Sequence, residues 1–191
     1  MSKTALLILD LQNGIMKRFS GDVSSYFSRA AEAVNAARSA GVTVIYVKTC
    51  FRAGHPDVSR TNASFERISA MGGFVEGDDS VAISSEVAPV DGDIIVTKRR
   101  VSAFTGSDLE VVLRSLGVGH LVLAGVATGG AVLSTLRQAA DMDYKATVLR
   151  DLCMDRDPES HRVLLEKIFT KQAEVLDAAE WVEGLSGGGI E

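Results

Sequence analysis

The sequence predicts an α/β protein built on a parallel sheet that helices cover on both faces. The first observation is a set of short apolar runs, typical of parallel strands with both faces buried, at residues 5–9, 42–47, 93–96, 121–126 and 146–149, with a shorter run at 174–176. The second is that segments with helical spacing separate these runs. Strands that alternate with helices favour a parallel sheet, because each helix returns the chain to the end of the sheet at which the strands begin.

The first half of the chain contributes two strands, one clear helix and a long loop. Residues 26–40 are predicted to form a helix, whose apolar face carries Phe27, Ala30, Ala33, Val34 and Ala37. Gly41 ends this helix in the way that a glycine after a helix commonly does, and the second strand follows. We expect a polar loop over residues 50–62 and a less regular stretch over residues 63–90, with a loop at residues 71–77.

The second half repeats the alternation. Ser107 is the predicted N-cap of a helix over residues 109–116, which Gly117 ends. The fourth strand then leads through a glycine-rich turn into a helix that begins at Ala131. A helix over residues 158–169 separates the fifth strand from the short sixth one. Each strand of the predicted sheet is thus followed by a turn or loop at its carboxyl end.

Composition indicates one globular domain and argues against several classes of partner. The chain has 191 residues, 46% hydrophobic and 24% charged, so we expect one domain over residues 1–185 and a flexible tail at residues 186–191. A net charge of -5 without a long basic run argues against nucleic acid. No apolar run approaches the roughly 20 residues of a spanning helix, and no signal-peptide pattern is present, so we expect a cytoplasmic protein without a membrane partner. Cys50 and Cys153 provide neither a disulfide framework nor a zinc spacing.

Polar residues follow three of the predicted strands at the point where each strand ends. Asp10 and Gln12 follow the first strand, Lys98 follows the third, and the turn at residues 128–131 follows the fourth. Ligands of open parallel sheets bind outside these carboxyl ends, so the residues mark a candidate site. Backbone N–H groups at the helix start can hold an oxyanion. A catalytic nucleophile can also occupy such a turn, but the residue there is Ala131, which has no reactive group.

Three ordered blocks resemble the signatures of one enzyme superfamily. They are LLILDLQNG at residues 6–14, TKRRVSAFTGSDLE at residues 97–110 and LVLAGVATGGAVLSTLRQAADMDY at residues 121–144. Over nearly its whole length the chain resembles the isochorismatase-like hydrolases, which include isochorismatases, nicotinamidases, carbamoyl-sarcosine amidases and related cysteine hydrolases. The resemblance implies a three-layer α/β/α sandwich with a six-stranded parallel sheet and Rossmann-like topology. It also implies a cis peptide before Ala127 and assembly as a homodimer or homotetramer.

The resemblance also assigns catalytic residues. The amidase members use an Asp–Lys–Cys triad, in which Asp10 matches the aspartate and Lys98 the lysine, while the position of the cysteine falls on Ala131. The chain is therefore identified as a cysteine-less member, and a thioester cannot form at this position. Isochorismatase proper also has a small residue there, and it cleaves a vinyl ether by acid catalysis with the aspartate donating a proton. Burial of Asp10 would favour that role, whereas Lys98 would oppose it while positioning a substrate carboxylate.

The remaining expectations for the site concern substrate binding and metal binding. The candidate substrate-binding residues are Gln12, Phe51, Arg60, Phe104, Ala127 and Thr128. The N–H groups of Ala127 and Ala131 would form an anion hole. His55 and Asp57 lie in the loop where nicotinamidases carry an Asp-x-His…His metal site, but the set is incomplete, so we expect no metal and no other cofactor.

Several functional hypotheses remain open on the sequence alone. The first is a hydrolase that acts on a small carboxylated metabolite, with Asp10 as acid or base and Lys98 as electrostatic anchor. The second is a non-catalytic small-molecule binder or assembly protein on the same fold, and an engineered Cys-to-Ala amidase is a further alternative. A weaker hypothesis keeps amidase chemistry with Cys153 as substitute nucleophile, although two isolated thiols are more often inert.

Overall fold

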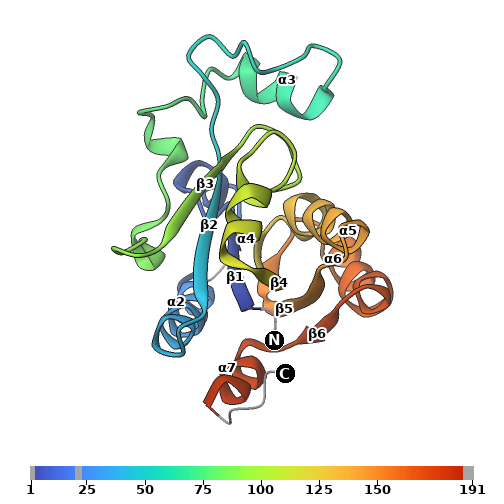
Figure 1. Cartoon of the computed structure of the whole chain (residues 1–191). Coiled ribbons are helices and arrows are strands. Elements are labelled where there is room, and N and C mark those ends of the chain that lie inside the picture. Colours follow the sequence, from blue (N-terminus) through green and yellow to red (C-terminus); the bar gives the residue numbers. More distant parts are fainter. Residues whose placement is uncertain (1–2, 20–22, 187–191) are drawn as a thin grey trace.

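In the computed structural model, which describes residues 3–19 and 23–186, the chain folds around one six-stranded sheet (Figure 1). The strand order is β3-β2-β1-β4-β5-β6, and every pair of neighbours is parallel. The strands are β1 (Lys3–Leu9), β2 (Thr43–Thr49), β3 (Ile94–Lys98), β4 (Val118–Val126), β5 (Lys145–Met154) and β6 (Glu174–Leu176). The predicted parallel α/β sheet is therefore confirmed.

Helices cover both faces of this sheet and make the three layers that the family resemblance implies (Figure 1). The helices are α1 (Asn13–Met16), α2 (Val23–Ser39), α3 (Ala63–Ala70), α4 (Leu109–Leu116), α5 (Leu133–Asp141), α6 (Pro158–Val163) and α7 (Ala178–Ser186). α2 and α7 pack on one face, while α4, α5 and the turns after α6 pack on the other. None of the described helices is long and apolar enough to cross a membrane.

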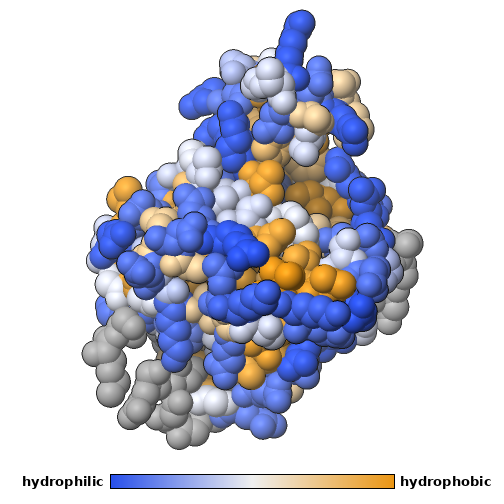
Figure 2. Space-filling view, turned by 90° about the vertical axis from the view of Figure 1, so that its right-hand side faces the viewer, coloured by the Kyte–Doolittle hydropathy of each residue, from blue (hydrophilic) through white to orange (hydrophobic). Residues whose placement is uncertain are grey.

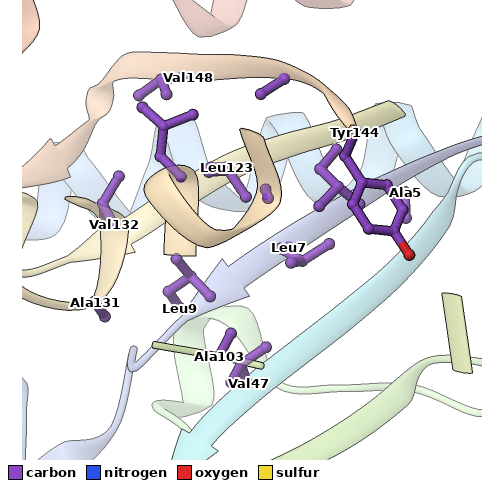
Figure 3. Close-up of a cluster of buried hydrophobic side chains, with 14 of the residues drawn as sticks. Ala5, Leu7, Leu9, Val47, Ala103, Leu123, Ala131, Val132, Tyr144 and Val148 are labelled. Atoms are coloured by element: carbon purple, nitrogen blue, oxygen red, sulfur yellow. The ribbon is translucent and has the colours of Figure 1, made fainter. Parts of the chain in front are cut away.

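The central strand β1 shows why the strands appear in the sequence as uninterrupted apolar runs. Ala5, Leu7 and Leu9 belong to the core beneath α4 and α5, and Figure 3 shows Leu7 and Leu9 pointing into it. Leu6 and Ile8 belong to the other core, beneath α2 and α7. Successive side chains of a strand point to opposite faces, so a strand with a core on each side needs apolar residues at every position.

β1 and β4 lie side by side at the centre of the sheet and approach each other closely at their carboxyl ends. Gly125 in β4 pairs with Leu9, and its φ of +131° is one that side chains rarely adopt. A Cβ atom at this position would lie 2.1 Å from the Leu9 carbonyl oxygen. The glycine is therefore required for the two strands to meet. The connections change direction between β1 and β4, which is where open sheets of this kind form a ligand crevice.

Several predicted boundaries differ from the structure. β4 is followed by a π-helical turn, Thr128–Val132, so α5 begins at Leu133 rather than at Ala131. β5 runs for 10 residues because a register shift against β4 lets the strand continue past the predicted end. The helix predicted over residues 158–169 is divided into α6, a π-helical turn and a 3₁₀ turn.

Two further predictions concern a capping residue and the tail. The N-cap residue of α4 is Asp108 rather than the predicted Ser107, but the Ser107 hydroxyl still accepts a hydrogen bond of 3.2 Å from the Leu109 N–H. Ser186, the first residue of the predicted tail, belongs to α7, and residues 187–191 lie outside the described residues.

Residues 50–81, which we call the cap, contain a helix that the sequence analysis missed. Figure 1 shows α3 projecting beyond the carboxyl ends of the strands. The Asn62 side chain accepts a hydrogen bond of 3.3 Å from the Phe65 N–H and so caps the start of α3. The cap has a small hydrophobic cluster of its own, separate from the two sheet cores, formed by Cys50, Phe51, Phe65, Phe74 and Val81. It therefore packs as a distinct unit above the end of the sheet.

Candidate active site

Asp10, Thr49 and Lys98 form a closed, buried network at the carboxyl ends of β1, β2 and β3. The Lys98 Nζ lies 2.8 Å from Asp10 Oδ2 and donates a hydrogen bond of 2.9 Å to the Thr49 hydroxyl. That hydroxyl donates in turn to Asp10 Oδ1 at 3.1 Å. The exposed fractions are 4% for Asp10, 4% for Thr49 and 2% for Lys98. Such a buried ion pair persists only when its polar atoms find partners, as they do here.

The sheet itself brings these three residues together. Thr49 and Lys98 are the last residues of their strands and are paired with each other in the register of β2 and β3. Asp10 follows β1 directly, and its N–H donates to the Val47 carbonyl at 2.9 Å. The φ of Asp10 is +57°, a left-handed conformation that aspartate tolerates better than most residues. Because β2 lies between β1 and β3, the Lys98 side chain reaches past Thr49 to meet the carboxylate.

The turn after β4 lies next to this network. The peptide between Val126 and Ala127 is cis, as the family resemblance implies. The Ala127 carbonyl accepts hydrogen bonds from the N–H groups of Gly130 at 2.9 Å and Val132 at 3.3 Å, the residues on either side of Ala131. These bonds close the turn tightly around position 131.

Residues that follow β5 hold the outer side of the same turn. Asp155 Oδ2 accepts a hydrogen bond of 2.7 Å from the Gly129 N–H. The Thr128 hydroxyl lies 2.8 Å from Nδ1 of His161, and burial lowers the pKa of this histidine, which favours the neutral ring. The turn is therefore fixed on two sides, by Asp155, which follows β5, and by His161, which lies in α6.

A cleft of about 630 Å³ opens between these strand ends and the cap. Four residues of the predicted site line it, namely Asp10, Lys98, Ala127 and Ala131, together with Thr49. Its other lining residues are Ile15, Arg18, Ser64, Phe65, Arg67, Ile68, Met71, Phe74, Val101, Val126, Gly130 and Arg156. Figure 2 shows the hollow below the projecting cap, with apolar residues inside it and hydrophilic residues around its edge. This volume suits a small molecule.

Five predicted substrate-binding residues do not line the cleft. Gln12 instead links β2 to the cap. Its amide nitrogen donates hydrogen bonds to the carbonyls of Thr49 and Val81, and its amide oxygen accepts a hydrogen bond from the Thr49 N–H. Phe51 is 1% exposed inside the cap cluster. Arg60 is exposed on the cap surface. None of these three side chains lines the cleft.

Phe104 and Thr128 also point away from the cleft. The Phe104 ring packs against Tyr144 in the sheet core, with the ring centroids 5.9 Å apart. The Thr128 side chain is fully buried against His161. Both residues follow strand ends in sequence, but the irregular turns that carry them rotate their side chains into the protein.

Sequence reasoning missed several residues that do line the cleft. The largest group comes from α3, which contributes Ser64, Phe65, Arg67 and Ile68. The three-residue spacing of Phe65 and Ile68 after a capping Asn62 was a signal for this helix. No local signal pointed to Arg18 or Arg156, because their places in the cleft depend on how distant segments meet.

Both thiols of the chain are free and buried outside the cleft lining. Cys153 pairs with Gly125 in the sheet, and burial raises its pKa to about 12. The description of the chain as cysteine-less therefore applies only to position 131. Within residues 3–19 and 23–186, no group of three or more His, Cys, Asp or Glu side chains is arranged to hold a metal ion.

An open parallel sheet with a buried aspartate–lysine pair in a cleft at its switch point is the architecture of a small-molecule enzyme. The chain belongs to the isochorismatase family, since the isochorismatase domain matches residues 4–180, and it is a hydrolase of that family.

Curated relatives and solved structures agree with this assignment. The chain is 34% identical over 179 residues to a ureidoacrylate amidohydrolase, RutB, of Stutzerimonas stutzeri, with 83% of this chain and 72% of the relative covered. It is 32% identical over 180 residues to RutB of Azorhizobium caulinodans, with 83% and 79% covered. An isochorismatase family protein from Burkholderia thailandensis has a TM-score of 0.83 at 28% identity, covering 96% of each chain. A cysteine hydrolase from Pseudomonas syringae pv. phaseolicola has the same fold, with a TM-score of 0.87 at 24% identity over 97% of this chain and 93% of that one.

Proposed function

We propose that the chain hydrolyses a small carboxylated metabolite, with Asp10 and Lys98 as its acid–base pair and water in place of a cysteine nucleophile. The observation that carries the proposal is the buried contact of 2.8 Å between Lys98 Nζ and Asp10 Oδ2 on the floor of the cleft. A buried ion pair is weak support for stability but is common at functional sites. Ala131 lines the same cleft and leaves room for water where a thiol would otherwise stand.

Asp10 acts first as a general base in this mechanism. Asp10 lines the cleft, and its two carboxylate oxygens accept hydrogen bonds from Lys98 and Thr49, so in the proposal it is the acceptor that takes a proton from water. Water attacks the electrophilic carbon of the substrate, its proton passes to Asp10, and the electron pair of the attacked double bond moves onto the substrate oxygen. When the intermediate collapses, the electron pair on the oxygen re-forms the double bond, the bond to the leaving group breaks, and Asp10 gives its proton to the leaving group and regains its resting state.

The turn at Ala131 stabilises the charge that develops on the substrate oxygen. In the proposal, the backbone N–H groups of Ala127 and Ala131 donate to this oxygen. The hydrogen bonds around the Ala127 carbonyl and the contact of Asp155 with Gly129 hold the turn before substrate arrives. A donor group that is already fixed needs no reorganisation during the reaction, which is why such turns lower the barrier.

The buried thiols argue for water as the nucleophile. Cys153 is 3% exposed and outside the cleft, and its raised pKa disfavours the reactive thiolate. We therefore set aside the hypothesis of a substitute nucleophile. No observation favours the binder or the engineered-variant hypothesis, and the matched relatives are named as amidohydrolases.

Replacing Asp10 with asparagine tests the proposal. Asparagine also tolerates a positive φ, so D10N should remain folded, although less stable because Lys98 loses its anionic partner, while kcat/KM falls by about 10²–10⁴-fold. The assay would follow the consumption of ureidoacrylate, N-carbamoylsarcosine and isochorismate by mass spectrometry, with circular dichroism to check folding. Asp91 is exposed in a turn, so D91N is the matched control and should retain full activity.

Two outcomes would contradict the proposal. Equal turnover by D10N and the unaltered protein would remove Asp10 from the chemistry. Loss of activity after alkylation of the unaltered protein with iodoacetamide would show that a thiol is required after all.

A further inference from the structure

We propose that Arg18, Arg67 and Arg156 form a carboxylate-binding site at the mouth of the cleft. The substrate's acid group would lie outward against these arginines, and the bond to be cleaved would lie inward against Asp10. The orientation of the cleaved bond rests on the proposed function, but the binding site itself is argued from charge and contacts alone.

The three arginines come from three separate parts of the chain and converge on one opening. Arg18 follows α1, Arg67 lies in α3 of the cap, and Arg156 lies between β5 and α6. All three line the cleft and are exposed, whereas Asp10 and Lys98 on the floor are buried. The guanidiniums therefore mark the mouth of the cleft, and the ion pair marks its inner end.

None of the three guanidiniums has a carboxylate partner within residues 3–19 and 23–186. By contrast, most other arginines of the described chain are engaged by carboxylates, namely Arg29, Arg38, Arg52, Arg99, Arg114, Arg150 and Arg162. Arg18 is instead held over the Phe74 ring, with its guanidinium 5.5 Å from the ring centroid. The stacking orients the group and leaves its N–H donors for a ligand.

The charge of the cleft is opposite in sign to that of the whole chain. The net charge of the protein is -5. Four cationic side chains line the cleft, and Asp10 is the only carboxylate among its described lining residues. Because Asp10 and Lys98 neutralise each other, the positive charge is concentrated at the three arginines. Such a cluster attracts an anion, and the planar fork of an arginine matches a carboxylate in two-point contact.

The wall between the mouth and the floor is apolar. Phe65, Ile68 and Phe74 line it from the cap, and Ile15 and Val101 line it from the segments that follow β1 and β3. A free inorganic anion would leave this surface without a partner. The structure thus points to an amphipathic organic acid, with an apolar body between its carboxylate and its hydrolysable group.

Matched acid and amide ligands test the proposal, because each pair differs in charge but hardly in shape. The probes are cinnamate with cinnamamide, 3-phenylpropionate with its amide, and hexanoate with hexanamide, measured by isothermal titration calorimetry at low salt. We expect at least one acid to bind about tenfold more tightly than its amide. R67Q and R156Q should each remove most of this preference, and R18Q should weaken it.

Arg60 provides a matched control, since it is an exposed arginine of the same cap that does not line the cleft. R60Q should keep the full preference for the acid. The proposal is overturned if no acid binds more tightly than its amide, or if R60Q reduces the preference as much as R67Q does.

The outcome is separable from that of the proposed hydrolysis, because binding is measured without turnover. Preference for acids in D10N and in the unaltered protein supports the carboxylate site whether or not any substrate is cleaved. Turnover of a substrate without any preference for acids would overturn the carboxylate site and leave the hydrolase proposal standing.

Discussion

The floor of the cleft and the cap above it are built by different physical means. The floor consists of strand ends held between two large cores, and its Asp10 and Lys98 are almost fully buried. The cap rests on a small cluster of its own, and Phe65 is the only buried residue of α3. Figure 1 shows the same contrast, with the sheet enclosed by helices and α3 projecting from it.

In the proposed mechanism, this difference separates the residues of the chemical step from the residues that select the substrate. Residues held by the sheet cannot move without disturbing two cores, so the proposed acid–base pair is fixed in place. Residues on the cap and on loops can change with little effect on the sheet, and such positions commonly determine binding. The arginines of the mouth belong to the second kind, since none of them is buried. We expect substitutions in the two regions to differ in the same way.

The largest loss of stability is expected from a substitution at Gly125, where β1 and β4 approach each other closely. In G125A the new methyl group would overlap the Leu9 carbonyl, and the backbone would keep an unfavourable φ. We expect the free energy of unfolding in urea to fall by more than about 4 kcal/mol, so that little folded protein remains. The matched substitution in the cap is G72A, where φ is +72° but no atom lies within 4 Å of the new Cβ. There we expect a loss of only about 1–2 kcal/mol.

Similar losses in the two glycine variants would contradict the comparison. They would mean that backbone conformation alone decides the cost and that the crowding of β1 and β4 contributes nothing.

A smaller but still large effect is expected when the ion pair on the floor is broken. K98M leaves the Asp10 carboxylate buried without its cation, so we expect the free energy of unfolding to fall by about 3–4 kcal/mol. Adding D10N to this variant should recover part of the loss, because the uncompensated charge is then removed. Urea denaturation of both single variants and of the double variant measures the coupling.

A surface ion pair serves as the control for this cycle. Arg114 and Glu110 lie 3.0 Å apart, but their side chains are 64% and 49% exposed. Breaking the pair with R114M should cost less than about 1 kcal/mol. A K98M variant as stable as R114M would show that Asp10 is accessible to water, and the floor would not be a sealed site.

The same contrast explains what the sequence could predict. The apolar runs and their alternation with helices were enough for the sheet, because burial on both faces leaves a strong pattern. The positions of Asp10 and Lys98 in the cleft could be predicted because both stand directly at strand ends, where a side chain has little freedom to point elsewhere. Phe104 failed as a pocket residue because the turn after β3 rotates it into the core, a rotation that spacing does not encode.

The cap was predicted less well for a physical reason. α3 has 8 residues and buries one of them, so its helical periodicity is too short to stand out from a loop. Arg18, Arg67 and Arg156 could not be grouped from the sequence, since only the folded chain brings their segments to one opening.

The smallest effect on the free energy of unfolding is expected from a substitution that loosens the packing of the cap. Phe65 and Phe104 are each 6% exposed, but Phe65 lies in the cap cluster and Phe104 in a sheet core. F104A should lower the free energy of unfolding by about 3–5 kcal/mol, as is usual for a phenylalanine of a main core. F65A should lower it by no more than about 2 kcal/mol, because the cap can open locally without unfolding the sheet.

Hydrogen exchange distinguishes local opening from global unfolding in this pair of variants. In F65A, we expect faster exchange confined to α3 and the rest of residues 50–81, together with weaker binding of the acid probes, since Phe65 lines the cleft wall. In F104A, exchange should rise throughout the sheet. If F65A instead accelerates exchange throughout β1 and β4, the cap and the sheet form one cooperative unit, and the proposed binding residues of the cap cannot change independently of the floor of the cleft.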